Sequence, residues 1–202
     1  MKIDQIMINS YSNQDIAYLR CAFVLSELSK AIRKRVGSIL VSYDNRIPYI
    51  ISDGVNGTDP GNSNICEDRE TGQTLDSVIH AEENCLNKIK NQDIKFLKST
   101  LYVTFQPCPN CCDMIIKFNE KNENKKITRV VYCYEYKNKA GLDRLSENGI
   151  ELVRIPMNDK LSWDLNLRSE MHYNFSGVYR SLGHSEENVN EFVKILLMAV
   201  KD

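Results

Sequence analysis

The chain has 202 residues, of which 42% are hydrophobic and 26% are charged, values that are ordinary for a soluble globular protein. Its formal net charge of −1 argues against a protein that follows long nucleic acids, because such proteins carry a basic surplus for the phosphates. No apolar run approaches the roughly 18–20 residues that span a bilayer, and residues 1–10 lack the apolar core of a secretory signal. We therefore expect a cytoplasmic protein with no membrane partner, for which nucleic acid is a poor candidate partner.

The cysteines support a reducing compartment. Their number is odd, and three of the seven fall within five residues: the positions are Cys21, Cys66, Cys85, Cys108, Cys111, Cys112 and Cys133. Such crowding is typical of metal binding or of small buried side chains rather than of a disulfide framework.

The hydrophobic pattern predicts helices and strands that alternate along the chain. We expect helices over 15–35, 78–89, 109–118 and 140–148, and strands over 36–42, 47–52, 100–105, 127–134 and 150–155. The polar stretch 53–77 contains four glycines and is predicted to be a functional or mobile loop. The charged run 119–126 is predicted to be a surface loop. This order indicates an α/β domain with helices layered over a central sheet.

A second region follows this domain. We expect a domain over residues 1–156 and a C-terminal extension over residues 157–202, which holds several aromatic residues and an amphipathic segment over 189–200. These apolar side chains predict that the extension packs on the domain or on a neighbouring subunit.

Two short motifs carry most of the chemistry. His80 and Glu82 form the H-x-E pattern, and Cys108 and Cys111 follow Pro107 in a P-C-x-x-C pattern. Together they are the signature of zinc-dependent base deaminases. One imidazole and two thiolates leave the fourth tetrahedral position of a zinc ion for water, as in catalytic sites. We predict that His80, Cys108 and Cys111 bind one Zn²⁺ and that Glu82 transfers protons.

Other assignments compete with this one. Glu83 is a rival carboxylate, although it lies outside the H-x-E spacing. Cys112 could take the place of Cys111, but one step along a helix turns its side chain about 100° away, which favours a buried core position. A structural zinc at Cys66 and Cys85 lacks a nearby histidine.

Five stretches of the chain resemble deoxycytidylate deaminases, especially those of tailed phages. They are residues 36–40 (VGSIL), 54–57 (GVNG), 80–84 (HAEEN), 101–111 (LYVTFQPCPNC) and 130–136 (VVYCYEY). The resemblance implies a three-layer cytidine-deaminase-like domain with a central mixed sheet flanked by helices. It also implies the hydrolysis of dCMP to dUMP and ammonia, which feeds thymidylate synthesis, and the host cytoplasm as location if the source is a virus.

The resemblance also assigns substrate contacts. Asn56 is expected to contact the sugar or base, and Ala81 and Tyr136 to contribute to the nucleotide pocket, although Asn56 could instead be a turn residue between glycines. The 5′-phosphate needs donors, for which Ser29 and Lys30 are candidates together with Arg33, Lys34 and Arg35. Cations at a helix C-terminus are also favoured by the helix dipole alone, by about 0.3–1 kcal/mol each, so both interpretations stay open.

Regulation is a further implication of the resemblance. The family is typically hexameric, activated by dCTP and inhibited by dTTP near a Gly-Tyr-Asn-Gly motif. We therefore expect a homo-oligomer, a hexamer by resemblance, with Gly54, Asn56 and Gly57 as candidate effector contacts. Val55 replaces the tyrosine of that motif. The loop over 58–77 also lacks the histidines that some phage members use for a second zinc.

Two other functions remain open. A deaminase of the same superfamily could act on a free base, a nucleoside, dCTP, tRNA or single-stranded DNA, and a polymer substrate would require a basic groove with aromatic platforms. Alternatively, the chain could be a nucleotide-binding module that has lost catalysis. The intact Glu82 argues against this second alternative, because a purely structural zinc site has no use for a carboxylate that is not a ligand.

Overall fold

The computed structural model describes residues 11–136, 138–157 and 161, and the statements below concern this part of the chain. Its helices are α1 (Asn13–Ser26), α2 (Ala81–Ile89), α3 (Pro109–Lys121) and α4 (Ala140–Glu147). Its strands are β1 (Gly37–Ser42), β2 (Tyr49–Val55), β3 (Phe96–Phe105), β4 (Lys125–Tyr134) and β5 (Glu151–Arg154). The predicted alternation of helices and strands is confirmed. The predicted C-terminal extension lies outside the described residues, apart from positions 157 and 161.

The five strands form one mixed sheet in the order β2-β1-β3-β4-β5. The β1 strand pairs antiparallel with both β2 and β3, whereas β3, β4 and β5 run parallel to one another. Parallel neighbours require a crossover connection, which α3 and α4 supply. The central mixed sheet expected from the resemblance is therefore present.

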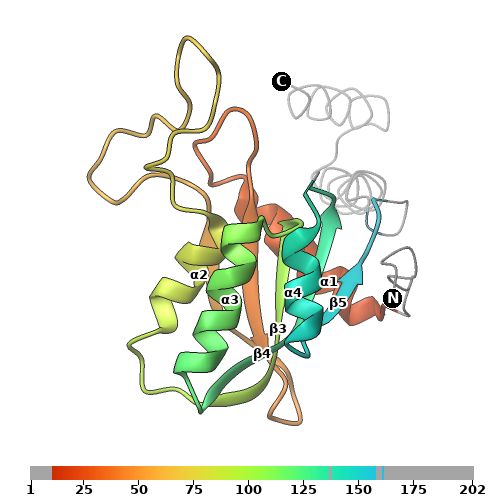
Figure 1. Ribbon diagram of the computed structural model, residues 1–202. Helices are drawn as coiled ribbons and strands as arrows, with labels where there is room; N and C mark the ends of the chain where they lie inside the picture. Colours follow the sequence, from red (N-terminus) through yellow and green to blue (C-terminus); the bar gives the residue numbers. More distant parts are fainter. Residues whose placement is uncertain (1–10, 137, 158–160, 162–202) are drawn as a thin grey trace, which may run out of the picture. The chain divides into compact units, whose positions relative to one another are not determined.

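The helices cover both faces of the sheet, which gives three layers (Figure 1). The α2, α3 and α4 helices lie over one face, where Cys85, Ile115 and Leu142 pack with Leu101 and other buried strand residues in the main core. The α1 helix covers the opposite face. Burying both faces explains why the central strand β3 is almost continuously apolar in its second half.

A buried polar network fastens α1 to the sheet. The Asp15 carboxylate closes a capping box with Ser12 at the helix start and accepts hydrogen bonds from Arg129 of β4 (2.5 Å) and from the Tyr102 hydroxyl of β3 (2.8 Å). Burial by itself raises the pKa of Asp15, but the hydrogen bonds from Arg129, Ser12 and Tyr102 outweigh it and hold that pKa below its ordinary value.

The prediction that the first helix extends to residue 35 is wrong. The α1 helix ends at Ser26, whose hydroxyl donates to the Phe23 carbonyl, and residues 27–36 form an irregular segment that we call the basic loop. Side chains from elsewhere satisfy its backbone. Asn56 bonds the Val36 N–H and the Lys34 carbonyl, while Glu67 accepts from the N–H groups of residues 32 and 33. These long-range partners replace the helical bonds that the local pattern suggested.

The predicted surface loop over 119–126 is also largely absent. The α3 helix continues to Lys121, and β4 already begins at Lys125. Lys125 is buried, and its ammonium donates to three carbonyls at the end of α2, those of Ile89, Lys90 and Gln92. The sequence suggests that Lys125 is exposed to solvent, but in the structure its ammonium caps the C-terminus of α2.

Candidate active site

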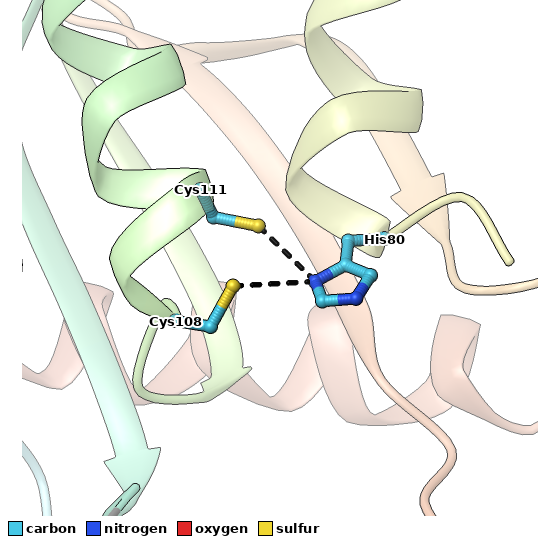
Figure 2. A group of neighbouring side chains, drawn as sticks. All are labelled: His80, Cys108 and Cys111. Atoms are coloured by element: carbon cyan, nitrogen blue, oxygen red, sulfur yellow. Dashed lines mark hydrogen bonds between the residues drawn. The ribbon is translucent and has the colours of Figure 1, made fainter. Parts of the chain in front are cut away.

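The two motifs meet between the starts of α2 and α3 (Figure 2). His80 Nδ1 lies 3.2 Å from Cys111 Sγ and 3.5 Å from Cys108 Sγ, and all three candidate ligand atoms lie within 4.8 Å of one another. These distances bring one nitrogen and two sulfurs around a single point, which is the donor set that zinc prefers. The three side chains therefore fit a zinc ion.

The transition from β3 to α3 positions both cysteines. Cys108 is the N-cap residue of α3, with Pro109 in the first turn, where its missing N–H costs nothing. The Cys112 N–H donates to the Cys108 carbonyl at 2.9 Å, and this first turn brings Cys111 close to His80. The positive end of the helix dipole favours thiolates at these positions.

Close backbone contact with the sheet positions the start of α2. A Cβ atom on Gly54 of β2 would lie 2.1 Å from the Ala81 carbonyl oxygen and 2.6 Å from the Cys85 nitrogen. The hydroxyls of Ser38 and Ser52 donate to the carbonyls of Ala81 (2.8 Å) and Cys85 (2.7 Å). The absence of a Cβ at Gly54 thus lets α2 approach the sheet and holds its N-cap residue, His80, opposite the cysteines.

Electrostatics distinguishes the titratable groups of the site. The hydrogen bond from Cys111 and the neighbouring His80 lower the pKa of Cys108 to about 4, so this thiol is ionised at neutral pH. The hydrogen bond with Cys108 in turn raises the pKa of Cys111, and burial raises it further. Glu82 is only 4% exposed, and burial raises its pKa to about 7. A bound cation would attract both thiolates and so lower the pKa of each cysteine.

The structure distinguishes between the residues that compete for the same role in the site. Glu82 lines a cavity together with His80 and Cys108, whereas Glu83 does not line it. Cys112 is fully buried in the core beneath α3, as predicted, and burial raises its pKa to about 12. Cys66 and Cys85 are buried in two different hydrophobic clusters, so they do not form a common metal site.

A cavity of about 470 Å³ opens above His80, Glu82 and Cys108. Its walls come from the basic loop, the 53–77 stretch, the start of α2 and the end of β3. The remaining lining residues are Arg33, Lys34, Val36, Asn56, Gln73, Thr74, Val78, Ala81, Phe105, Gln106 and Tyr136. Charged, amide and aromatic groups thus converge on the predicted zinc position, which is the composition of a small-molecule site.

One wall combines a cation with two rings. The Lys34 ammonium lies 5.4 Å from the centre of the Phe105 ring and 5.6 Å from that of Tyr136. Sequence reasoning missed Phe105 and its neighbour Gln106. The Gln106 amide donates to the Asn138 carbonyl at 2.9 Å and accepts from the Tyr136 N–H at 3.2 Å. It therefore fixes the segment that carries Tyr136 into the cavity.

The candidate phosphate donors divide into two groups. Arg33 and Lys34 line the cavity, and neither forms an ion pair within the described part of the chain. Lys30 borders a different depression, and the Arg35 guanidinium donates to the Ala31 carbonyl. The Ser29 hydroxyl is 3% exposed and bonds Asn56, so it is turned away from the cavity.

Asn56 lines the cavity, yet most of its amide is engaged by protein. Its Oδ1 accepts from the Ser29 hydroxyl at 2.8 Å and from the Val36 N–H at 2.7 Å, and its Nδ2 donates to the Lys34 carbonyl at 2.9 Å. The structure therefore shows Asn56 organising the basic loop. One amide hydrogen remains for a ligand.

The other members of the 54–57 motif have structural contacts of their own. Gly54 packs against α2, and Gly57 exchanges two backbone hydrogen bonds with Ile79, just before His80. The Val55 carbonyl accepts from the Asn84 amide at 3.0 Å. These contacts help to position α2 and the basic loop, and whether the motif also binds an effector stays a prediction.

Comparison with known proteins agrees with the fold and the site. Residues 12–132 match the family model of the cytidine and deoxycytidylate deaminase zinc-binding region. The match covers more than half of the chain and includes all three candidate ligands. The fold and the site define a zinc-dependent deaminase. The chain belongs to the cytidine and deoxycytidylate deaminase family.

Several individual relatives are named as deaminases of deoxycytidylate. The chain is 27% identical over 190 residues to the deoxycytidylate deaminase of Enterobacteria phage T4, with 72% of this chain and 93% of that protein covered. It is 31% identical to a probable deoxycytidylate deaminase of Caenorhabditis elegans, with 69% of this chain and 66% of that protein covered. The crystal structure of a dCMP deaminase from cyanophage S-TIM5, in complex with dCMP and dUMP, matches with 32% identity and a TM-score of 0.62. That match covers 73% of this chain and all of the cyanophage chain.

Within the described residues, no helix combines the length and the apolar character needed to cross a membrane.

Proposed function

We propose that the protein deaminates dCMP to dUMP, with His80, Cys108 and Cys111 as zinc ligands and Glu82 as the catalytic acid and base. One observation carries the proposal: the buried Glu82 lines the same cavity as His80 and Cys108, whose ligand atoms lie within 4.8 Å of that of Cys111, and this cavity also presents two cations. The relatives named above as deoxycytidylate deaminases support the choice of substrate.

The reaction breaks the bond between C4 of cytosine and its exocyclic nitrogen and forms a bond from C4 to a water oxygen. A zinc ion held by these three ligands supplies a Lewis acid that lowers the pKa of water from about 15.7 towards 7. Glu82 accepts a proton from the attacking water, delivers it to N3 of the ring and then moves the second water proton to the leaving nitrogen. Water and dCMP thus give dUMP and ammonia, with Glu82 returned to its initial state.

The remaining lining residues recognise the nucleotide. Arg33 and Lys34 face the cavity with no ion pair in the described part of the chain and suit the 5′-phosphate, which is dianionic at neutral pH. Tyr136 and Phe105 offer apolar surface beside Lys34, and Ala81 lies between His80 and Glu82 at the cavity floor. Ser29 contributes indirectly through Asn56, and Lys30 lies away from this cavity.

A substrate panel tests the proposal. The purified full chain is incubated with dCMP, deoxycytidine, CMP, dCTP and a cytosine-containing oligonucleotide, and ammonia release is measured. We expect the highest kcat/KM for dCMP and a loss for deoxycytidine, which has no phosphate. A preference for deoxycytidine or for the oligonucleotide would contradict dCMP as substrate while leaving the zinc site intact.

The same assay addresses regulation and assembly. Addition of dCTP or dTTP shows whether an effector acts despite Val55, and sedimentation of the protein measures the expected homo-oligomer. The hexamer, the effectors, the cytoplasmic location and the extension over residues 157–202 stay predictions.

A further inference from the structure

The polar stretch before α2 contains a small folded unit. The Leu75 N–H donates to the Cys66 carbonyl, and the Asp68 N–H donates to the Gln73 carbonyl, at 2.9 and 2.8 Å. The Asp68 carboxylate then accepts from the backbone of residues 70 and 71 and so closes the turn. We call residues 66–75 the hairpin. It is an organised element rather than an open loop.

The hairpin contributes to the candidate active site in two ways. Gln73 and Thr74, near its end, line the cavity. Its apolar side packs against the basic loop, because Cys66, Leu75 and Val78 surround Ala31 in a separate small hydrophobic cluster. The hairpin and the basic loop therefore form opposite sides of one small core.

Glu67 adds a polar connection between these two segments. Its carboxylate accepts hydrogen bonds from the N–H groups of Ile32 at 3.1 and 3.2 Å and of Arg33 at 3.1 Å. These groups lie 34 and 35 residues away in the sequence. Bonds from N–H groups to a carboxylate are about twice as strong as those between neutral groups. The backbone of the residue that carries one cavity cation is thus fixed by a side chain of the hairpin.

Asn56 and Glu67 hold the basic loop at different points. Asn56 bonds Lys34 and Val36 at the end of the loop, and Glu67 bonds Ile32 and Arg33 just before them. Between these two anchors the loop presents Arg33 and Lys34 to the cavity. Without Glu67, Arg33 would follow an unanchored stretch of backbone, and ordering it around an anion would cost conformational entropy.

We infer that Glu67 is a positioning residue that sets the preference for a phosphorylated substrate by fixing the backbone that carries Arg33 and Lys34. This inference rests on the proposed function, because it assigns the phosphate of the nucleotide to these two cations. Glu67 does not itself line the cavity. Its removal therefore affects recognition of the phosphate and leaves the zinc ligands and Glu82 in place.

The test compares three variants of the full chain. Glu67→Ala removes the acceptor, and Glu67→Gln keeps an oxygen acceptor without the charge. Glu70→Ala removes an exposed carboxylate from the same hairpin and serves as the matched control. For each protein, kcat and KM are measured with dCMP and with deoxycytidine, and the dissociation constants of dUMP and deoxyuridine are measured by calorimetry. Thermal unfolding verifies that the variants are folded.

We expect Glu67→Ala to raise the KM for dCMP and the dissociation constant of dUMP about tenfold, the order of effect of one lost hydrogen bond to a charged group. The values for deoxycytidine and deoxyuridine should change less than twofold, Glu67→Gln should restore most of the loss, and Glu70→Ala should match wild type. Equal losses with and without the phosphate, or no loss in Glu67→Ala, would overturn the inference.

The two proposals fail in different ways. Wild-type protein that does not turn over dCMP contradicts the proposed function. Wild-type protein that turns over dCMP, but whose preference for the phosphate survives in Glu67→Ala, contradicts only the role of Glu67. If wild type binds dUMP no better than deoxyuridine, the assignment of the phosphate to Arg33 and Lys34 is wrong, and the role of Glu67 is wrong with it.

Discussion

The two sides of the cavity are built differently. On one side, the starts of α2 and α3 bring His80, Cys108 and Cys111 together, and buried helices and strands fix these starts through close backbone contact. On the other side, the basic loop presents Arg33 and Lys34, and its backbone N–H groups donate hydrogen bonds to the side chains of Asn56 and Glu67. The groups proposed for chemistry thus lie on the core of the domain, and those proposed for recognition lie on anchored loops.

Because of this difference, substitutions on the two sides of the cavity should have different effects. A substitution beneath the helix starts disturbs the whole fold, because it shifts backbone that is packed on the sheet. A substitution in the basic loop or the hairpin changes only which molecule is bound. We therefore expect the two sides to respond to mutation in separable ways, and three experiments beyond those on Glu67 probe this separation.

The largest expected effect is on catalysis at the helix starts. Glu82→Gln should lower kcat for dCMP by about 10³-fold, within the range usual for the loss of an acid–base group. The zinc content, measured by mass spectrometry, should stay at the wild-type level because all three ligands remain. Glu83→Gln, one position along α2, should keep kcat within about twofold. Substantial turnover by Glu82→Gln would show that another group transfers the protons.

A second experiment tests the close contact that holds α2. Gly54→Ala should destabilise the protein by about 3 kcal/mol, because its Cβ would lie 2.1 Å from the Ala81 carbonyl oxygen and the backbone would have to move. The zinc content should fall with it, since His80 is carried by the same turn. The matched control is Gly57→Ala, where no atom lies within 4 Å of an added Cβ. Equal stability of the two variants, measured by urea unfolding, would contradict this role of Gly54.

The smallest effect concerns α1, the helix from which the basic loop departs. Because the pKa of Asp15 lies below its ordinary value of 3.8, its ionised form stabilises the fold at neutral pH. This contribution is complete above the ordinary pKa and is lost as the pH falls through the lowered one. Asp15→Asn should therefore cost about 2 kcal/mol at pH 7 and much less near pH 2.

Urea unfolding at several pH values measures this difference, with the exposed Asp93→Asn as control. A cost for Asp15→Asn that does not change with pH would mean that the ion pair with Arg129 contributes nothing. Activity towards deoxycytidine at pH 7 should remain in this variant, because Asp15 lies on the face of the sheet away from the main core beneath α2 and α3.

Sequence reasoning predicted the start of α3 correctly, whereas the predicted start of the second helix at residue 78 lies three residues before the observed start of α2 at Ala81. His80, Glu82, Cys108 and Cys111 belong to short motifs whose spacing is read within a few residues, and the strand-to-helix transition at Pro109 has a strong local signal. The order of the strands and helices followed equally from local periodicity. The structure brings these four residues together; their roles as ligands and acid–base group stay predictions.

The basic loop could not be predicted in this way. Residues 27–35 have the composition of a helix, but Asn56 and Glu67, which are distant in sequence, bond the backbone of this segment in its irregular conformation. For the same reason Ser29 was assigned to the phosphate although its hydroxyl bonds Asn56. Phe105 and Gln106 were overlooked because nothing in their local sequence signals a cavity wall.

The cap that Lys125 places on α2 has a consequence for dynamics. An isolated helix of this length would open from its ends, but α2 is bound at its start by the sheet and at its end by an ammonium from β4. We therefore expect little fraying at either end of α2 and slow exchange of the amide hydrogens in its middle. Because both ends of the helix are held, we expect the proposed catalytic groups at its start to keep their positions while the domain stays folded.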